Sequence, residues 1–266
     1  FFLEDAKNFR FGGIYRSPLP FHSRTIGLAS NGSRVPIQLG GKLTGKSGKW
    51  NLGFLGVELD ETEDLDRDEV YVSRVSYDVL EESSIGGIFT MGDPRSNSDA
   101  ETYGLDFELK DSSLGELKEG IIRGWGLATE GEEHDYGWGL SAVYPNNPLY
   151  ARASLQRVGE DLDPAVGFIR RPGIHEFFGL ISYELYPEGN ILNEVDLELN
   201  TQVDMGLDLN ALSEDIELST EFEFESGDRA EFALSRQRQL FDKDFEIFDD
   251  IFVPAGNFNY WRGHAE

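Results

Sequence analysis

The sequence predicts an all-β fold, an antiparallel transmembrane β-barrel in which about twelve or more strands form part of a larger barrel. Three observations lead to this prediction. Apolar and polar residues alternate along most of the chain, which is the pattern of strands with one apolar face. The alternating runs exceed the ~5–6 residues of a typical globular strand and match the ~9–11 residues that cross a bilayer at a tilt. Short and long joins alternate between the runs, as in outer-membrane barrels.

Three runs show the alternation most clearly. Run 103–110 places Tyr, Leu and Phe on one face, and Gly, acids and Lys on the other. Runs 191–204 and 216–225 repeat the pattern with Ile, Leu, Val and Phe opposite carboxylates. Further strands are expected at 35–45, 48–59, 69–80, 84–92, 118–129, 135–144, 149–157, 174–186 and 229–240. One more begins near 257, so we expect residues 31–266 to form a barrel domain that is truncated at its C-terminal end.

The joins between these runs fall into two classes. Short turns with the sequences TGKSGK, EESS, PNNP, PEGN and SGDR follow every second strand. Longer joins are expected at 60–69, 91–100, 159–173, 205–214 and 241–256, while TEGEEHD is short and weakens the rule. Short turns at one rim and long loops at the other are typical of a membrane barrel with one rim in the periplasm.

The first part of the chain, residues 1–30, is expected to form a plug or collar. If 35–45 were the first strand and a periplasmic domain preceded it, the long loops would face the wrong side of the membrane. An additional strand near 20–28, or upstream of residue 1, would restore the usual orientation.

Composition excludes several classes of partner and chemistry. Fifty acids against 23 Lys and Arg give a formal charge of −27, which argues against nucleic acid as a partner. The chain has no cysteine, so disulfides and thiolate metal sites are excluded. No apolar run approaches the ~20 residues of a membrane helix. The expected partners are outer-membrane lipid and lipopolysaccharide, with an envelope protein as a further candidate.

The polar faces of the expected strands would line the barrel lumen, and they are acidic. The candidate lumen-lining residues are Asp106, Glu108, Glu194, Asp196, Glu198, Glu217, Glu221 and Glu223. In an open channel such a wall would favour cations and polar solutes. The alternative is that these carboxylates pair with inward basic residues and with a plug.

The SGDR hairpin supports the assignment of two faces to these strands. A three-residue loop at 227–229 predicts that Phe224 lies opposite Phe232, and Phe222 opposite Leu234. The same register puts Arg236 on the lipid-facing side, where it would cost about 2–4 kcal/mol. Either a bulge turns Arg236 inward or this register is wrong.

Signals for catalysis and metal binding are weak, so no enzyme, cofactor or metal is expected. The four His residues have no metal-site spacing, and no nucleophile or phosphate-binding motif is present. Asp64, Asp66 and Asp68 have the spacing that opens a calcium loop, but Glu69 stands where Gly is required. Aromatic residues near strand ends are expected to form an interfacial girdle, with sugar stacking as the alternative: Trp125, Tyr136, Trp138, Tyr144, Tyr150 and Trp261.

An ordered series of motifs resembles a family of bacterial envelope proteins of unknown function. The motifs are FFLEDAKNFRF, FHSRTIGL, VPIQLGGKLTGKSGKWNLGFLGVE, SSIGGIFTMGDP and VGEDLDPAVGFIRR, and they cover nearly the whole chain. In that family a carbohydrate-binding-like β-sandwich, absent here, precedes an outer-membrane barrel. The segment IYRSPLPFHSR departs from the compact aromatic-Ser-Arg-Arg segment of the family. The resemblance implies location in the bacterial outer membrane and a barrel architecture, and it implies no activity.

The loop GEDLDPAVGFIRRPG is similar to a signature loop of that family. Its expected roles are a fixed turn, from Pro164 and Gly167, and a charged lid over the barrel mouth, from Asp161, Asp163, Arg170 and Arg171. Three functions therefore stay open. The first is a pore or transport component for polar solutes or oligosaccharides. The others are a plugged barrel that anchors a partner, and a soluble carbohydrate-active all-β protein.

Overall fold

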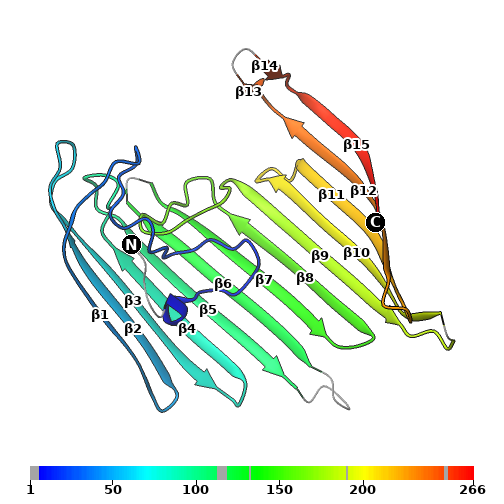
Figure 1. The fold of residues 1–266 in the computed structure, drawn as a ribbon. Coiled ribbons are helices and arrows are strands. Elements are labelled where there is room, and N and C mark those ends of the chain that lie inside the picture. The colour runs from blue at the N-terminus through cyan, green and yellow to red at the C-terminus, as the bar shows by residue number, and fades with distance from the viewer. Residues whose placement is uncertain (1–5, 113–118, 132, 190, 249–250) are drawn as a thin grey trace. The chain divides into compact units, whose positions relative to one another are not determined.

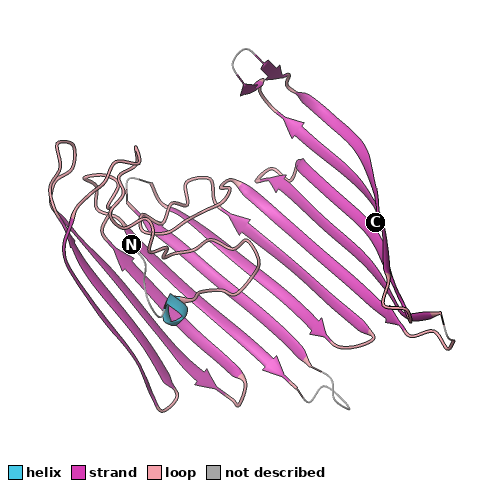
Figure 2. Cartoon of the chain, in the orientation of Figure 1, coloured by secondary structure: helices cyan, strands magenta, loops and turns pink. Residues whose placement is uncertain are grey.

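The computed structural model describes residues 6–112, 119–131, 133–189, 191–248 and 251–266, and its regular structure is almost entirely antiparallel β (Figures 1 and 2). A short 3-10 helix, η1 (Ala6–Phe9), precedes the strands. Thirteen strands form one sheet in the order β1 to β12 followed by β15, and β13 and β14 form a separate hairpin. The predicted all-β antiparallel fold is confirmed.

Each of the thirteen strands in the large sheet lies where the alternation predicts one. Their bounds are β1 (Ile37–Ser47), β2 (Trp50–Leu59), β3 (Asp68–Val79), β4 (Ser83–Met91), β5 (Glu101–Asp111), β6 (Gly120–Glu130), β7 (Asp135–Pro145), β8 (Leu149–Val158), β9 (Ile174–Leu185), β10 (Leu192–Gly206), β11 (Ala211–Phe224), β12 (Arg229–Phe241) and β15 (Gly256–Ala265). The sequence did not predict β13 (Phe245–Phe248) and β14 (Ile251–Val253), which are shorter than the runs that alternation reveals.

Two expectations about the joins are wrong. Residues 20–28 form turns and contain no strand, so no added strand at that place resolves the orientation. The join expected at 205–214 is a tight turn, because β11 begins at Ala211. In this turn the Gly206 N–H donates to the Asn210 carbonyl at 2.9 Å, and Leu209 adopts a positive φ of 66°.

The predicted register of the β11–β12 hairpin is also wrong. Phe232 lies opposite Thr220 in place of Phe224, and Phe222 lies opposite Ala230. The turn begins earlier than expected, because the Phe224 N–H donates to the Asp228 carbonyl at 3.0 Å. The slip is an even number of residues, so every side chain keeps its predicted face.

The chain divides into two compact units. The first contains residues 1–111, 121–140 and 156–173, and the second contains residues 112–120, 141–155 and 174–266.

The core of the first unit lies between one face of its strands and the N-terminal segment, which crosses over them (Figure 1). The buried apolar side chains of the strands include Leu55, Val57, Leu59, Val70, Val72 and Ile88, and those of the segment include Phe9, Phe11, Ile14 and Ile26. The other face of the same strands keeps large apolar side chains exposed, among them Leu52, Phe54, Val75, Ile85, Tyr103 and Leu105. The two faces of this sheet therefore have different surroundings.

Close approach of the segment depends on glycine at one position. A Cβ built on Gly104 would lie 2.7 Å from both Phe11 and Ile88, which is closer than side-chain carbons approach. The absence of a side chain at Gly104 therefore makes room for the Phe11 ring against β5.

We predict that Gly104→Val destabilises the first unit by about 1–3 kcal/mol, because the added carbons force Phe11 out of its position. The free energy of unfolding, measured by urea titration with tryptophan fluorescence, checks this. Gly126→Val on β6 is the control, since a Cβ there meets nothing within 4 Å. Equal free energies for the two variants would contradict the packing of the N-terminal segment on β5.

A pair of engineered cysteines tests the hairpin register. The native chain has no cysteine, so introduced thiols can pair only with each other. Leu218→Cys with Leu234→Cys places two Cα atoms directly opposite, within disulfide range, and should form the bond on mild oxidation. Phe224→Cys with Phe232→Cys would be offset by about 13 Å along the strands and should stay reduced. Non-reducing peptide mapping distinguishes the two, and the reverse result would restore the register predicted from sequence.

Candidate functional site

Residues 159–173 form a packed loop whose two ends are hydrogen-bonded to each other. The Gly173 N–H donates to the Gly159 carbonyl at 3.0 Å, and the Gly167 N–H donates to the Pro164 carbonyl at 2.7 Å. Pro164 and Gly167 thus form the turn at which the sequence places them. A Cβ on Gly167 would lie 2.2 Å from the Leu19 carbonyl oxygen, so only glycine fits against the N-terminal segment.

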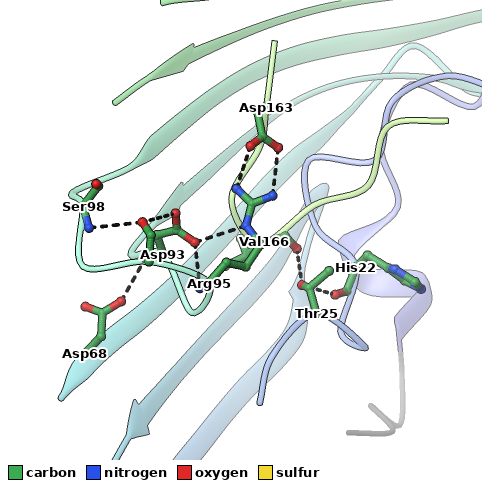
Figure 3. Close-up of polar contacts among 9 residues, drawn as sticks. His22, Thr25, Asp68, Asp93, Arg95, Ser98, Asp163 and Val166 are labelled. Carbon is green, nitrogen blue, oxygen red and sulfur yellow. Dashed lines mark hydrogen bonds and ion pairs between the residues drawn. The ribbon is translucent and has the colours of Figure 1, made fainter. Parts of the chain in front are cut away.

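Main-chain hydrogen bonds attach this loop to the N-terminal segment. Leu19 and Phe168 exchange two bonds of 2.9 and 2.8 Å, and the His22 N–H donates to the Val166 carbonyl at 2.8 Å. The Thr25 hydroxyl lies within 2.7 Å of the His22 carbonyl and 3.0 Å of the Val166 carbonyl (Figure 3). The N-terminal segment therefore contacts both the sheet face and the loop.

Arg95 connects the same loop to the β4–β5 join. Its guanidinium donates two bonds of 2.9 Å to the Asp163 carboxylate and one of 3.2 Å to Asp93 (Figure 3). The Asp93 N–H in turn donates to Asp68 at 3.0 Å. Burial lowers the pKa of the Arg95 guanidinium, but its bonds and ion pairs with Asp163 and Asp93 outweigh this and raise it above its usual value. Arg95 therefore stays charged across the working pH range.

The other charged residues predicted to form the lid are Asp161, Arg170 and Arg171. The Asp161 N–H donates to the Asp135 carboxylate at 3.1 Å, while the Asp161 side chain stays exposed. Arg170 is exposed, and Arg171 is half-buried. Of Asp161 and Asp163, Asp163 is the one whose carboxylate forms an ion pair with a described residue, Arg95.

A cavity of about 740 Å³ lies beside the loop, within the first unit. The joins at 93–100 and 160–172 line it, together with the end of β6, Gly131 and Glu133, and with Thr25 and Ser30. Its described lining includes seven carboxylates, from Asp93, Asp99, Glu130, Glu133, Glu160, Asp161 and Asp163, against the single guanidinium of Arg95. The arrangement is a strongly negative pocket of small-molecule size.

Two of the candidate lumen-lining carboxylates pair with arginines on the inner face of the first unit. Asp106 accepts bonds of 2.6 and 2.9 Å from Arg74, and its Oδ2 also accepts the Gly12 N–H at 2.9 Å. The Arg74 guanidinium lies 5.7 Å from the centroid of the Phe11 ring. Glu108 accepts a bond of 2.5 Å from Arg123. Asp106 therefore joins the sheet to the N-terminal segment, and Glu108 joins β5 to β6.

The other six candidates lie together on one face of β10 and β11 in the second unit. The register places Glu194 opposite Glu223, Asp196 opposite Glu221 and Glu198 opposite Ser219, with Glu217 two residues further along. Arg229 lies 3.0 Å from Glu223 and 3.4 Å from Glu221, and Arg262 lies 3.4 Å from Glu217. The face carries more carboxylates than these two arginines neutralise.

One aromatic residue expected in an interfacial girdle is placed differently. Trp125 is buried on the inner face, 4% exposed, and its Nε1–H donates to Gln156 at 3.1 Å. The expectation is wrong because glycines on the next strand make room for the ring, since a Cβ on Gly139 would lie 2.3 Å from Trp125. Tyr136, Trp138 and Trp261 are exposed.

Sequence reasoning missed Arg74, Arg95 and Thr129. Arg74 lies on the polar face of an alternating strand, and the alternation itself is the signal that could have paired it with Asp106. Arg95 and Asp163 are 68 residues apart, and no local pattern connects them. Thr129 is 5% exposed and lines the cavity, and its hydroxyl is buried without a hydrogen-bond partner.

Two structural features are absent from the described residues. They contain no group of three or more His, Cys, Asp or Glu side chains arranged to hold a metal ion. No helix in the described part of the chain is long and apolar enough to cross a membrane.

The fold and site define an all-β protein built on one antiparallel sheet of thirteen strands, with a loop-bounded acidic cavity in its first unit. The chain matches no family model, no curated protein and no solved structure.

A double-mutant cycle on Arg95 and Asp163 tests the anchoring of the loop. Arg95→Gln and Asp163→Asn should each destabilise the loop, with a coupling energy of about 1 kcal/mol, because the bidentate pair is only partly screened by solvent. Amide hydrogen exchange of residues 159–173 measures the effect. The Arg67–Asp60 pair, with one bond of 3.3 Å and a more exposed guanidinium, is the control and should couple more weakly. Equal coupling in both cycles would show that Arg95 does not hold the loop.

Proposed function

We propose that the chain is the membrane-embedded part of a bacterial outer-membrane β-barrel protein. The observation that carries the proposal is the apolar outer face of the strands, which no described segment covers. Leu105 is 73% exposed and Leu43 is 72% exposed. A soluble sheet buries such a face against a second layer, because large exposed apolar patches cause association in water.

The second unit supports the same proposal. Its strands expose Leu197, Leu199, Leu218, Phe232, Leu234 and Trp261 on the face opposite the carboxylates. An apolar face towards lipid and a polar face towards the interior is the alternation of membrane strands. The strands are 9 to 15 residues long in the large sheet, enough to cross a bilayer at a tilt. The motifs that resemble the envelope family imply the same location.

Among the functions that this location allows, we favour a plugged barrel that anchors or scaffolds a partner at the cell envelope. The N-terminal segment fills the inner face of the first unit with Phe9, Phe11 and Ile14. Its hydrogen bonds to β5 and to the loop at 159–173 hold the segment in a position that restricts a solute path through this unit. A second candidate is a cation-favouring pore, which the carboxylate face of β10 and β11 supports.

The outer face provides the sharpest test of the membrane proposal. Leu105→Lys should destabilise the protein folded in lipid vesicles by about 2–4 kcal/mol, because it puts a charge into hydrocarbon. Leu80→Lys is the matched control, since Leu80 is 74% exposed but lies in the β3–β4 turn. In a soluble protein both substitutions would leave the free energy of unfolding almost unchanged, and that result would contradict the proposal.

Conductance in planar bilayers separates the two candidate functions. The plugged barrel predicts no steady conductance for the folded chain. A chain that conducts cations, and loses that preference in Glu221→Gln/Glu223→Gln, would be a pore.

A further inference from the structure

We propose that Arg236, on the apolar face of the second unit, is the centre of a binding site for the phosphate group of an acylated glycolipid in the outer leaflet. The chemical class is that of lipid A, which carries phosphate monoesters and several acyl chains on one headgroup. The proposal rests on the membrane role proposed above and adds a particular lipid and a particular place on the sheet.

Arg236 lies on the apolar face of β12, directly opposite Ile216 on β11 and Trp261 on β15. Leu218 and Leu234 form the next pair on this face. No register shift interrupts the pairing of β12 with either neighbour, so no bulge turns Arg236 towards the carboxylate face. The corrected register therefore gives Arg236 new partners but leaves its charge on the side that faces lipid.

The guanidinium of Arg236 is unpaired in the part of the chain that the structure describes. The residue is exposed, and its side chain makes no hydrogen bond, ion pair or ring contact with a described residue. An arginine on the lipid-facing side of a membrane strand destabilises the protein. An anion bound to this guanidinium would reduce that cost, because charges in or near hydrocarbon are stabilised by pairing.

The surroundings of Arg236 are positive, although the whole chain has a formal charge of −27. Arg238 lies on the same face, about 7 Å further along the strand. It pairs with Glu214 at 3.2 Å and donates a hydrogen bond of 3.1 Å to Asn257. Among the paired residues of β11, β12 and β15, Glu214 is the one carboxylate on this face, against two guanidiniums. The charge of this face therefore selects an anion.

The apolar neighbours of Arg236 require hydrocarbon as well as an anion. Leu218 is 58% exposed, Leu234 is 51% exposed and Trp261 is 67% exposed. A free phosphate ion would pair with the guanidinium and leave these side chains uncovered. An anionic lipid satisfies both requirements, and a phosphate headgroup suits arginine because the planar guanidinium binds two phosphate oxygens at once.

The position of Arg236 along β12 selects the leaflet. β12 runs from the short turn at 226–228 to the long join at 242–255, and Arg236 lies in the half of the strand nearer the long join. Long joins face outwards in membrane barrels of this kind. Arg236 would therefore lie in the outer leaflet, where lipid A is the main phosphorylated lipid of bacterial outer membranes.

Native mass spectrometry of the full chain in maltoside detergent, titrated with lipid A, tests the proposal. We expect one lipid A to bind per chain. Arg236→Gln should weaken the affinity about tenfold, because charge-assisted hydrogen bonds to the phosphate are lost. Dephosphorylated lipid A should bind the wild-type chain and Arg236→Gln equally weakly.

Arg229→Gln is the matched control. The Arg229 side chain lies on the same strand and is 67% exposed, but it pairs with Glu221 and Glu223 on the opposite face. The substitution removes the same charge and should leave the affinity for lipid A unchanged. Arg236→Lys keeps the charge and loses the planar fork, so its affinity should fall between those of the wild type and Arg236→Gln.

Thermal unfolding provides a second readout that detects a failure to fold. Lipid A should raise the melting temperature of the wild-type chain and of Arg229→Gln, because a ligand that binds only the folded state stabilises it. Arg236→Gln removes an unpaired charge from an apolar face, so without lipid it should melt no lower than the wild type. Its melting temperature should rise less when lipid A is added.

Four results would overturn the proposal. They are an unchanged affinity in Arg236→Gln, an equal loss of affinity in Arg229→Gln, binding of phosphatidylglycerol as tight as that of lipid A, and a dimer mass in place of the lipid adduct that Arg236→Gln abolishes. Each of them leaves the Leu105→Lys test of the membrane role untouched, because Leu105 lies in the first unit and that test needs no lipid A. Failure of the Leu105→Lys test would instead remove the membrane role itself.

Discussion

The rest of the structure depends on the alternation of side chains in an extended chain. Neighbouring residues of a strand must point to opposite faces, so a period of two in the sequence becomes two chemically different surfaces. In the first unit one surface packs against the N-terminal segment, and the other leaves Leu52, Phe54 and Leu105 exposed. In the second unit one surface collects carboxylates and the other collects Leu and Phe. Pairing preserves this division, because a slip of two or four residues changes partners without changing faces.

The inner face of the first unit combines packing with charge. Gly104 makes room for Phe11, and Asp106, two residues further along β5, binds both Arg74 and the Gly12 N–H. Arg74 and Asp106 are 9% and 13% exposed, and removing one partner of such a pair leaves a buried charge uncompensated. The steric fit and the ion pair therefore fix the same segment on the same strand.

The sequence was sufficient to locate the strands, but it did not predict their register or the contacts between residues far apart in the chain. Alternation located all thirteen strands of the large sheet because it is a local property of each run. The register of β11 and β12 depends on which residues close the turn. The Ser-Gly-Asp-Arg stretch does not specify these residues, and the centre of the turn lies two residues earlier than predicted. Trp125 faces inward because glycines of a different strand accept its ring, and Arg95 meets an aspartate 68 residues away. Contacts of this kind have no local signature, and the orphan hydroxyl of Thr129 can be recognised only when its surroundings are known.

The attachment of the N-terminal segment has a consequence for the order of folding. The Gly12 N–H donates to Asp106, which is 94 residues later in the chain. The Thr25 hydroxyl donates to the Val166 carbonyl, which is 141 residues later. The N-terminal segment thus finds its binding partners only after β5 and the β8–β9 join exist. Contacts across such separations close large loops and form late, at a high entropic cost. Until those elements have formed, Phe9 and Phe11 lack the sheet face that buries them.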